Sequence, residues 1–99
     1  MELPIAPSCD LDADGLRRQR ERYEHAGEGA TLRERTARLL SVEVTSKGAE
    51  VVPELIEVEK ACCPFFELSW DPGCNRFSIG VPDDEHEPAL DAVAYALGL

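Results

Sequence analysis

The fold is decided within residues 50–70, EVVPELIEVEKACCPFFELSW, where a helical pattern gives way to a strand-like one. In the first part, apolar side chains recur in steps of four, three and four residues, at Val51, Leu55, Val58 and Cys62. This spacing places them on one face of an α-helix and predicts a helix from Glu50 to Cys62. Pro64 disfavours helical backbone at the residue before it, so we expect the helix to end there and a strand to follow.

The segments on both sides of this helix alternate between apolar and polar side chains, which is the pattern of half-buried strands. The alternating segments are 40–45, 66–70 and 77–81. Turn-forming residues fill 71–75 between the last two segments, which therefore predict a β-hairpin. Residues 31–35 form either a separate strand that pairs with the strand at 40–45, or an extended segment that leads into that strand. Residues 46–48 are expected to form a turn.

Two further helices flank this central part of the chain. An amphipathic pattern predicts a helix over 16–26, with Asp12 or Asp14 as its N-terminal cap. A final helix is expected over 88–97. The acidic residues 83–87 precede it, and negative charge there suits the positive end of the helix dipole. We therefore interpret this acidic run as a helix start.

Together these elements predict an α+β protein, a two-layer sandwich in which helices pack on a three- or four-stranded, mostly antiparallel sheet. The order resembles part of a ferredoxin-like arrangement. A right-handed crossover would join the strands on either side of the central helix if they are parallel neighbours. At 99 residues the chain fits a single domain, 1–99. The segment 1–14, which contains prolines and acidic residues, is expected to be an extended arm.

The charge of the chain limits the classes of partner. Ten basic against twenty acidic residues give a net charge of −10, so we expect no nucleic-acid partner. Arginines cluster at Arg17, Arg18, Arg20 and Arg22. We interpret them as a solvated helix face with i,i+4 ion pairs such as Arg17–Glu21. The apolar stretches are too short to span a membrane and no signal-peptide pattern follows Met1, so we expect a cytoplasmic protein without a membrane partner.

The most informative side chains are the four cysteines, Cys9, Cys62, Cys63 and Cys74. In a cytoplasmic protein they are expected to be reduced. The sequence contains neither the CxxC spacing of zinc and redox motifs nor an HExxH motif. Cys74 lies in the predicted turn and is expected to be an incidental exposed thiol. Cys62 and Cys63 lie at the C-terminal end of the predicted helix, where the dipole raises a thiol pKa, which disfavours a thiol enzyme.

Adjacent thiols at a helix end suit a soft metal ion or a metalloid, because such an ion deprotonates its thiol ligands directly. We predict such a site at Cys62 and Cys63, with Cys9 as a third ligand. His86 is a further candidate if the fold brings it close to Cys62. Cu(I) is an example of the thiophilic ions that sulfur ligands select. Redox sensing through the same thiols is a related alternative.

A second interpretation makes the cysteines structural. Cys62 continues the apolar stripe of its helix, and a cysteine in that place packs like a small apolar side chain. The protein would then be a non-catalytic domain that forms a homodimer or binds an unknown protein partner through an exposed apolar surface or sheet edge. Metal binding, and its loss when Cys62 and Cys63 are substituted, distinguishes the two interpretations.

The segment EKACCPFF, residues 59–66, resembles the motif of a family of small bacterial proteins, in which a glutamate and a Cys-Cys-Pro-Phe sequence follow one another at the end of a helix. The resemblance extends to residues 79–81, residues 87–91 and the Ser8-Cys9 pair. It implies a hairpin and a closing helix after the motif. The resemblance also favours Cys9, Cys62 and Cys63 over Cys74 as site residues. No activity is established for that family, so the resemblance implies no catalytic residue.

Overall fold

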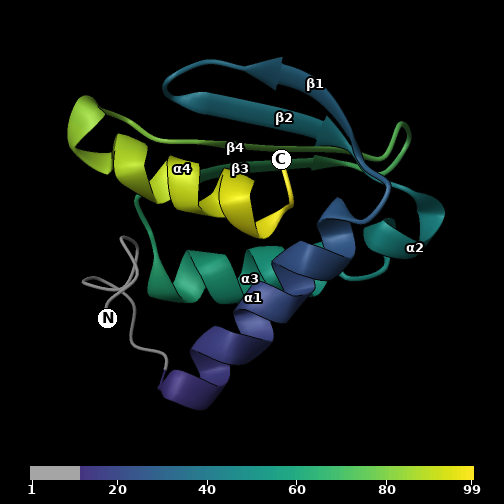
Figure 1. The fold of residues 1–99 in the computed structure, drawn as a ribbon, viewed down its shortest axis with the longest axis horizontal. Coiled ribbons are helices and arrows are strands. Elements are labelled where there is room, and N and C mark those ends of the chain that lie inside the picture. Colours follow the sequence, from purple (N-terminus) through teal and green to yellow (C-terminus); the bar gives the residue numbers. More distant parts are fainter. Residues whose placement is uncertain (1–11) are drawn as a thin grey trace.

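The structure is a computed structural model and describes residues 12–99 (Figure 1). In chain order its elements are helix α1 (Ala13–Gly27), strand β1 (Thr31–Arg35), strand β2 (Leu39–Glu43), helix α2 (Ser46–Ala49), helix α3 (Val52–Cys62), strand β3 (Glu67–Asp71), strand β4 (Arg76–Gly80), the 3-10 turn η2 (Asp84–His86) and helix α4 (Glu87–Ala96). The strands form one antiparallel sheet in the order β1-β2-β4-β3. The predicted α+β class is therefore confirmed, and residues 31–35 form a separate strand.

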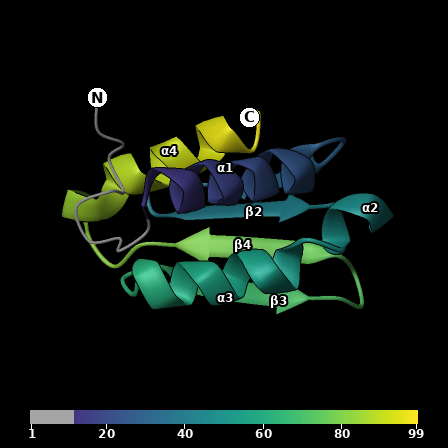
Figure 2. The same cartoon turned by 90° about the horizontal axis from the view of Figure 1, so that it is seen from below.

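The helices of the described chain lie on one side of the sheet, as Figures 1 and 2 show from two directions. α3 contacts β3 and α4 contacts β2, so these two helices cover different halves of the same face. α1 packs across α2, α3 and α4. The candidate site lies where α1 meets α3, within the helix layer.

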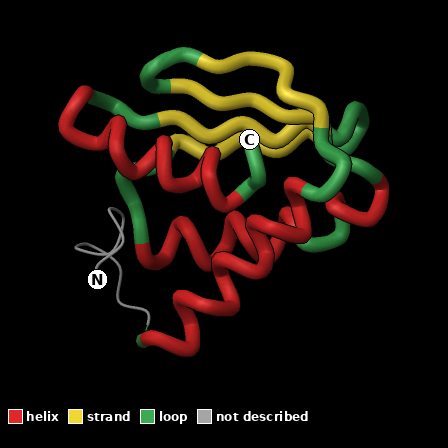
Figure 3. The backbone as a smooth tube through the Cα atoms, viewed as in Figure 1, coloured by secondary structure: helices red, strands yellow, loops and turns green. Residues whose placement is uncertain are grey.

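The chain passes from β2 through α2 and α3 to β3, as the tube in Figure 3 traces. β2 and β3 each pair antiparallel with β4, so they run parallel to each other with β4 between them. The two strands on either side of the central helix are therefore parallel but are not neighbours. The reason is that β3 and β4 form a hairpin whose second strand pairs with β2.

The sheet has one apolar and one polar face. On the apolar face, the side chains of its two central strands are buried, and they are Leu40, Val42, Phe77 and Ile79. On the other face Ser41, Ser78 and Ser69 lie in register across three strands. The hydroxyl oxygens of Ser41 and Ser78 are 2.9 Å apart. This difference between the faces follows directly from the alternation in the sequence.

A short helix replaces the turn expected at residues 46–48, so that prediction was wrong. Thr45 has extended backbone, with φ −74° and ψ 170°. Its hydroxyl accepts a hydrogen bond from the Gly48 N–H at 3.1 Å. Thr45 therefore acts as the N-terminal cap of α2, and the chain continues from α2 almost directly into α3.

Helix α1 begins earlier than the pattern predicted. The Asp12 side chain caps it by accepting a hydrogen bond from the Gly15 N–H at 2.8 Å. Ala13 and Asp14, which were expected to belong to an extended arm, are therefore helical. The rest of that arm, residues 1–11, lies outside the described residues.

The ion pairs of α1 differ from those expected. Arg17 pairs with Asp14, and Arg22 lies 3.5 Å from Glu54 of α3. The expected Arg17–Glu21 pair is not among the ion pairs of the described residues. Long side chains on a helix lean toward its N-terminus, where Arg17 meets Asp14. Arg22 departs from the predicted solvated face, because its side chain is only 18% exposed and turns toward α3.

Two leucines allow a matched test of the core. Leu55 in α3 is 0% exposed, whereas Leu32 in β1 is 48% exposed. We expect Leu55→Ala to lower the free energy of unfolding by about 3 kcal/mol, because the lost side chain leaves a cavity. Leu32→Ala makes the same chemical change at the surface, and we expect a loss of about 0.5 kcal/mol or less. Urea unfolding measures both variants, and equal losses would contradict the burial described here.

Candidate metal site

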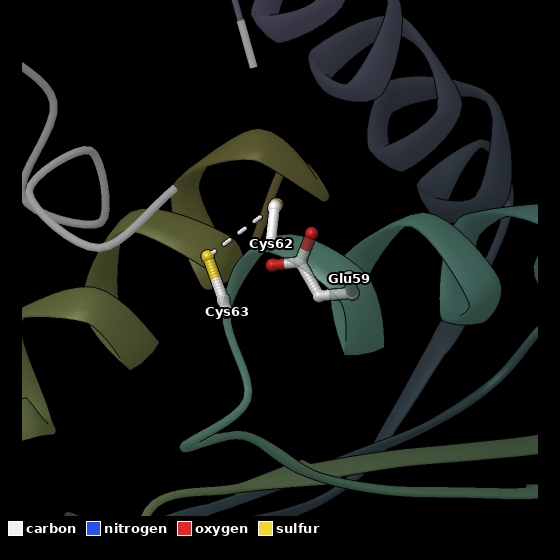
Figure 4. A group of neighbouring side chains, drawn as sticks. All are labelled: Glu59, Cys62 and Cys63. Atoms are coloured by element: carbon white, nitrogen blue, oxygen red, sulfur yellow. Dashed lines mark hydrogen bonds between the residues drawn. The ribbon is translucent and has the colours of Figure 1, made fainter. Parts of the chain in front are cut away.

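The last turn of α3 and the residue after it provide three potential metal ligands. Glu59 and Cys62 are three residues apart and so lie on the same side of the helix. Cys63 leaves helical backbone, with φ −133° and ψ 73°, while its N–H donates to the Glu59 carbonyl oxygen at 2.7 Å. This change of direction before Pro64 lets two adjacent cysteines border the same space. Figure 4 shows the three side chains around that space.

The three side chains converge inside the protein. One ligand atom from each of Glu59, Cys62 and Cys63 lies within 4.8 Å of the other two. The two sulfur atoms are 3.7 Å apart. Glu59 and Cys63 are 0% exposed and Cys62 is 4% exposed. A carboxylate and two sulfurs in so small a buried space can serve together as ligands of one metal ion.

One oxygen of the Glu59 carboxylate is held by α1. The Gln19 amide nitrogen donates to Glu59 Oε1 at 2.7 Å and to the Leu55 carbonyl oxygen at 3.0 Å. The Gln19 amide oxygen in turn accepts a hydrogen bond from Arg22 at 2.7 Å. Gln19 is 3% exposed, so this contact between α1 and α3 is itself buried.

Two buried oxygens at this site make no hydrogen bond within the described part of the chain. They are the second carboxylate oxygen of Glu59, Oε2, and the hydroxyl oxygen of Tyr23. The Tyr23 hydroxyl lies beside the Glu59 carboxylate, and the two groups shift each other's pKa. Buried polar atoms are nearly always partnered, because an unpartnered one costs free energy. The interior therefore presents oxygen atoms that a bound cation would stabilise.

The same burial shifts the proton affinities of the site. Burial raises the pKa of the Cys63 thiol to about 12, and the neighbouring Glu59 carboxylate adds to this increase. Burial also raises the pKa of Glu59, against the opposite influence of the Gln19 and Tyr23 side chains. The raised thiol pKa agrees with the sequence prediction, but its causes are burial and Glu59. Without a metal ion, the Cys63 thiol thus keeps its proton at neutral pH, and a metal ion has to displace it.

The oxidation state of Cys62 differs from the expectation that the cysteines are reduced. Cys62 is disulfide-bonded in the structure. A cysteine binds metal ions as a thiolate, so Cys62 can act as a ligand only after that bond is reduced. Cys74, in contrast, is a free and exposed cysteine between β3 and β4, as the sequence predicted.

His86, predicted as a further ligand, makes its contacts outside the cluster of Glu59, Cys62 and Cys63. Its ring packs on Phe65, with 4.3 Å between the ring centroids, and its Nδ1 lies 2.6 Å from Asp83. The Asp83 side chain also accepts a hydrogen bond from the His86 N–H, which starts η2 and α4. The acidic run before the last helix therefore acts as a helix start. His86 is not in the ligand cluster that forms within the described residues.

Cys9 lies outside the described residues, so its predicted role as a third thiol ligand stays a prediction. The structure adds Glu59, which the analysis of composition and spacing did not select. The feature of the sequence that marks Glu59 is its helical spacing, because it shares the buried face of α3 with Val52, Leu55 and Cys62. Gln19 and Tyr23 lie four residues apart on the buried face of α1, and that spacing could have marked them.

Comparison of the chain with protein-family models, with curated proteins and with solved structures finds no match. Within the described residues, the structure has no helix that is long and apolar enough to cross a membrane.

The buried carboxylate should reduce the stability of the metal-free protein. Glu59→Gln keeps the shape of the side chain and an oxygen for Gln19, but it removes a carboxyl that burial disfavours in its charged form. We expect the metal-free variant to gain about 1 kcal/mol in free energy of unfolding at pH 7. Glu57→Gln, at an exposed position of the same helix, should change stability by less than about 0.5 kcal/mol. Urea unfolding in a chelator measures both, and a clear loss of stability in Glu59→Gln would contradict this view.

Proposed function

We propose that the reduced protein binds a thiophilic metal ion through Cys62 and Cys63, with Glu59 as an oxygen ligand. The observation that carries this proposal is the convergence of the buried Glu59 carboxylate and two buried sulfur atoms, whose ligand atoms lie within 4.8 Å of one another. From the sequence we further propose Cys9 as an additional thiolate ligand. The function is binding of the ion itself, for storage, transfer or sensing, and the protein is not proposed to be an enzyme.

Electrostatics supports a cation at this place. Two thiolates and one carboxylate bring three negative charges into a buried space, and such charges are costly unless they are compensated. The Arg22 guanidinium donates to the Gln19 oxygen and pairs with Glu54, and no ion pair of the described residues involves Glu59. A metal ion would supply the missing positive charge and release the protons that the metal-free site holds.

The raised pKa of Cys63 supports binding over thiol catalysis. A catalytic cysteine needs a substantial thiolate fraction near neutral pH, which requires a lowered pKa. Here burial and the Glu59 carboxylate act in the opposite direction. A metal ion can still deprotonate such a thiol, because the metal–sulfur bond replaces the proton.

The resemblance of residues 59–66 supports a further proposal, that the chain belongs to the family of small bacterial proteins with the Cys-Cys-Pro-Phe motif. The buried cluster gives that motif a physical interpretation. The glutamate and both cysteines of the motif are the three residues whose ligand atoms converge. The proline that follows would fix the point at which the helix ends.

Metal stoichiometry of the reduced protein tests the proposed function. Anaerobic native mass spectrometry with Cd²⁺ should show one ion per wild-type chain. The double variant Cys62→Ser/Cys63→Ser should lose affinity at least 100-fold, because serine is a poor ligand for a thiophilic ion. Cys74→Ser removes the exposed cysteine outside the cluster and should bind like the wild type. Equal stoichiometry in the wild type and the double variant would contradict the proposal.

The same measurement addresses the interpretation in which the cysteines only pack. In that case the reduced wild type binds no metal ion, and Cys62→Ala changes only the stability of the protein. Light scattering of the same samples then shows whether the protein is a homodimer, which stays a prediction from the sequence.

A further inference from the structure

We propose that Gln19 makes this site selective for divalent ions that accept both sulfur and oxygen ligands, such as Zn²⁺ and Cd²⁺, over Cu(I). It does so by fixing the Glu59 carboxylate so that one oxygen faces the two sulfurs. This inference rests on the proposed function and specifies its ligand class. Gln19 is a positioning residue, since it acts through its hydrogen bond to the Glu59 carboxylate.

The spacing of the sulfur atoms favours a bent arrangement around the metal. Two metal–sulfur bonds of about 2.3 Å at a tetrahedral angle place the sulfurs about 3.8 Å apart, whereas a linear arrangement with the same bonds places them about 4.6 Å apart. With Cys62 disulfide-bonded, the distance between the Cys62 and Cys63 sulfurs is 3.7 Å. A reduced pair that keeps this spacing suits a tetrahedral ion and suits a linear two-coordinate ion less well.

The Glu59 oxygen adds a preference of its own. Carboxylate oxygen is a ligand for Zn²⁺, whereas soft ligands such as thiolates select Cu(I). Charge acts in the same direction, because the two thiolates and the carboxylate together carry three negative charges. A divalent ion leaves one of these uncompensated in the buried site, and a monovalent ion leaves two.

The hydrogen bonds of Gln19 allow one orientation of its amide. Both acceptors beside it, Glu59 Oε1 and the Leu55 carbonyl oxygen, need the nitrogen, and the donor Arg22 needs the oxygen. Arg22 is held in turn by Glu54, 3.5 Å away. Gln19 therefore fixes the orientation of the carboxylate through Oε1, while Oε2 accepts no hydrogen bond within the described residues.

The test compares the affinities of Cd²⁺ and Cu(I) for the reduced protein, each by competition with a chelator of known affinity. Gln19→Met keeps the length of the side chain but removes its hydrogen bonds. We expect it to weaken Cd²⁺ binding at least 10-fold and to change Cu(I) binding less than 3-fold. Arg20→Met is the matched control at an exposed position of the same helix, and both affinities should stay as in the wild type.

Each outcome decides between defined alternatives. Equal weakening of both ions in Gln19→Met would show a merely structural role and overturn the inference, as would no change for either ion. Glu59→Gln provides a second variant with the same expected loss of Cd²⁺ preference, should Gln19→Met fold poorly. Absence of both ions from the wild type would contradict the proposed function itself, which is a result distinct from the loss of selectivity.

Discussion

The hydrogen bond between Gln19 and Glu59 joins two helices through a buried carboxylate, in a place where apolar side chains would pack at lower cost. It connects residues 40 positions apart, at a donor–acceptor distance of 2.7 Å. The bond holds one oxygen of the carboxylate, and a carboxylate oxygen of Glu59 lies within 4.8 Å of the Cys62 and Cys63 sulfurs. A carboxylate that is buried and only partly hydrogen-bonded is costly in the metal-free protein, and a bound cation would compensate that cost.

The fold provides the rigid frame for this arrangement. α3 covers the β3 half of the sheet, and its buried stripe begins with apolar residues before it reaches Glu59. The helix ends at Cys62, and the chain then turns toward β3 within four residues. Because Cys62 ends the helix and Cys63 begins the turn, their sulfurs are positioned by the backbone that links the helix to the sheet. The site is thus part of the connection between the two layers.

Local patterns in the sequence predicted most of the fold. The helix ending before Pro64 and the hairpin of β3 and β4 follow from periodicity and from the backbone restrictions of proline. The turn expected at residues 46–48 was wrong, because the effect of Thr45 as a helix cap depends on its extended backbone. The position of β4 between β2 and β3 is a property of strand pairing over long sequence separations, which local patterns do not contain.

The candidate site was only partly predictable. Adjacent cysteines are visible in any sequence, and they indicated Cys62 and Cys63. Glu59 follows Glu57 in a charged segment, so its burial becomes evident only once Gln19 of another helix lies against it. The account can be tested most directly by X-ray absorption at the zinc edge of the reduced, zinc-loaded protein. It predicts a mixed shell with sulfur at about 2.3 Å and oxygen at about 2.0–2.2 Å. A shell without sulfur, or one of sulfur alone, would contradict it.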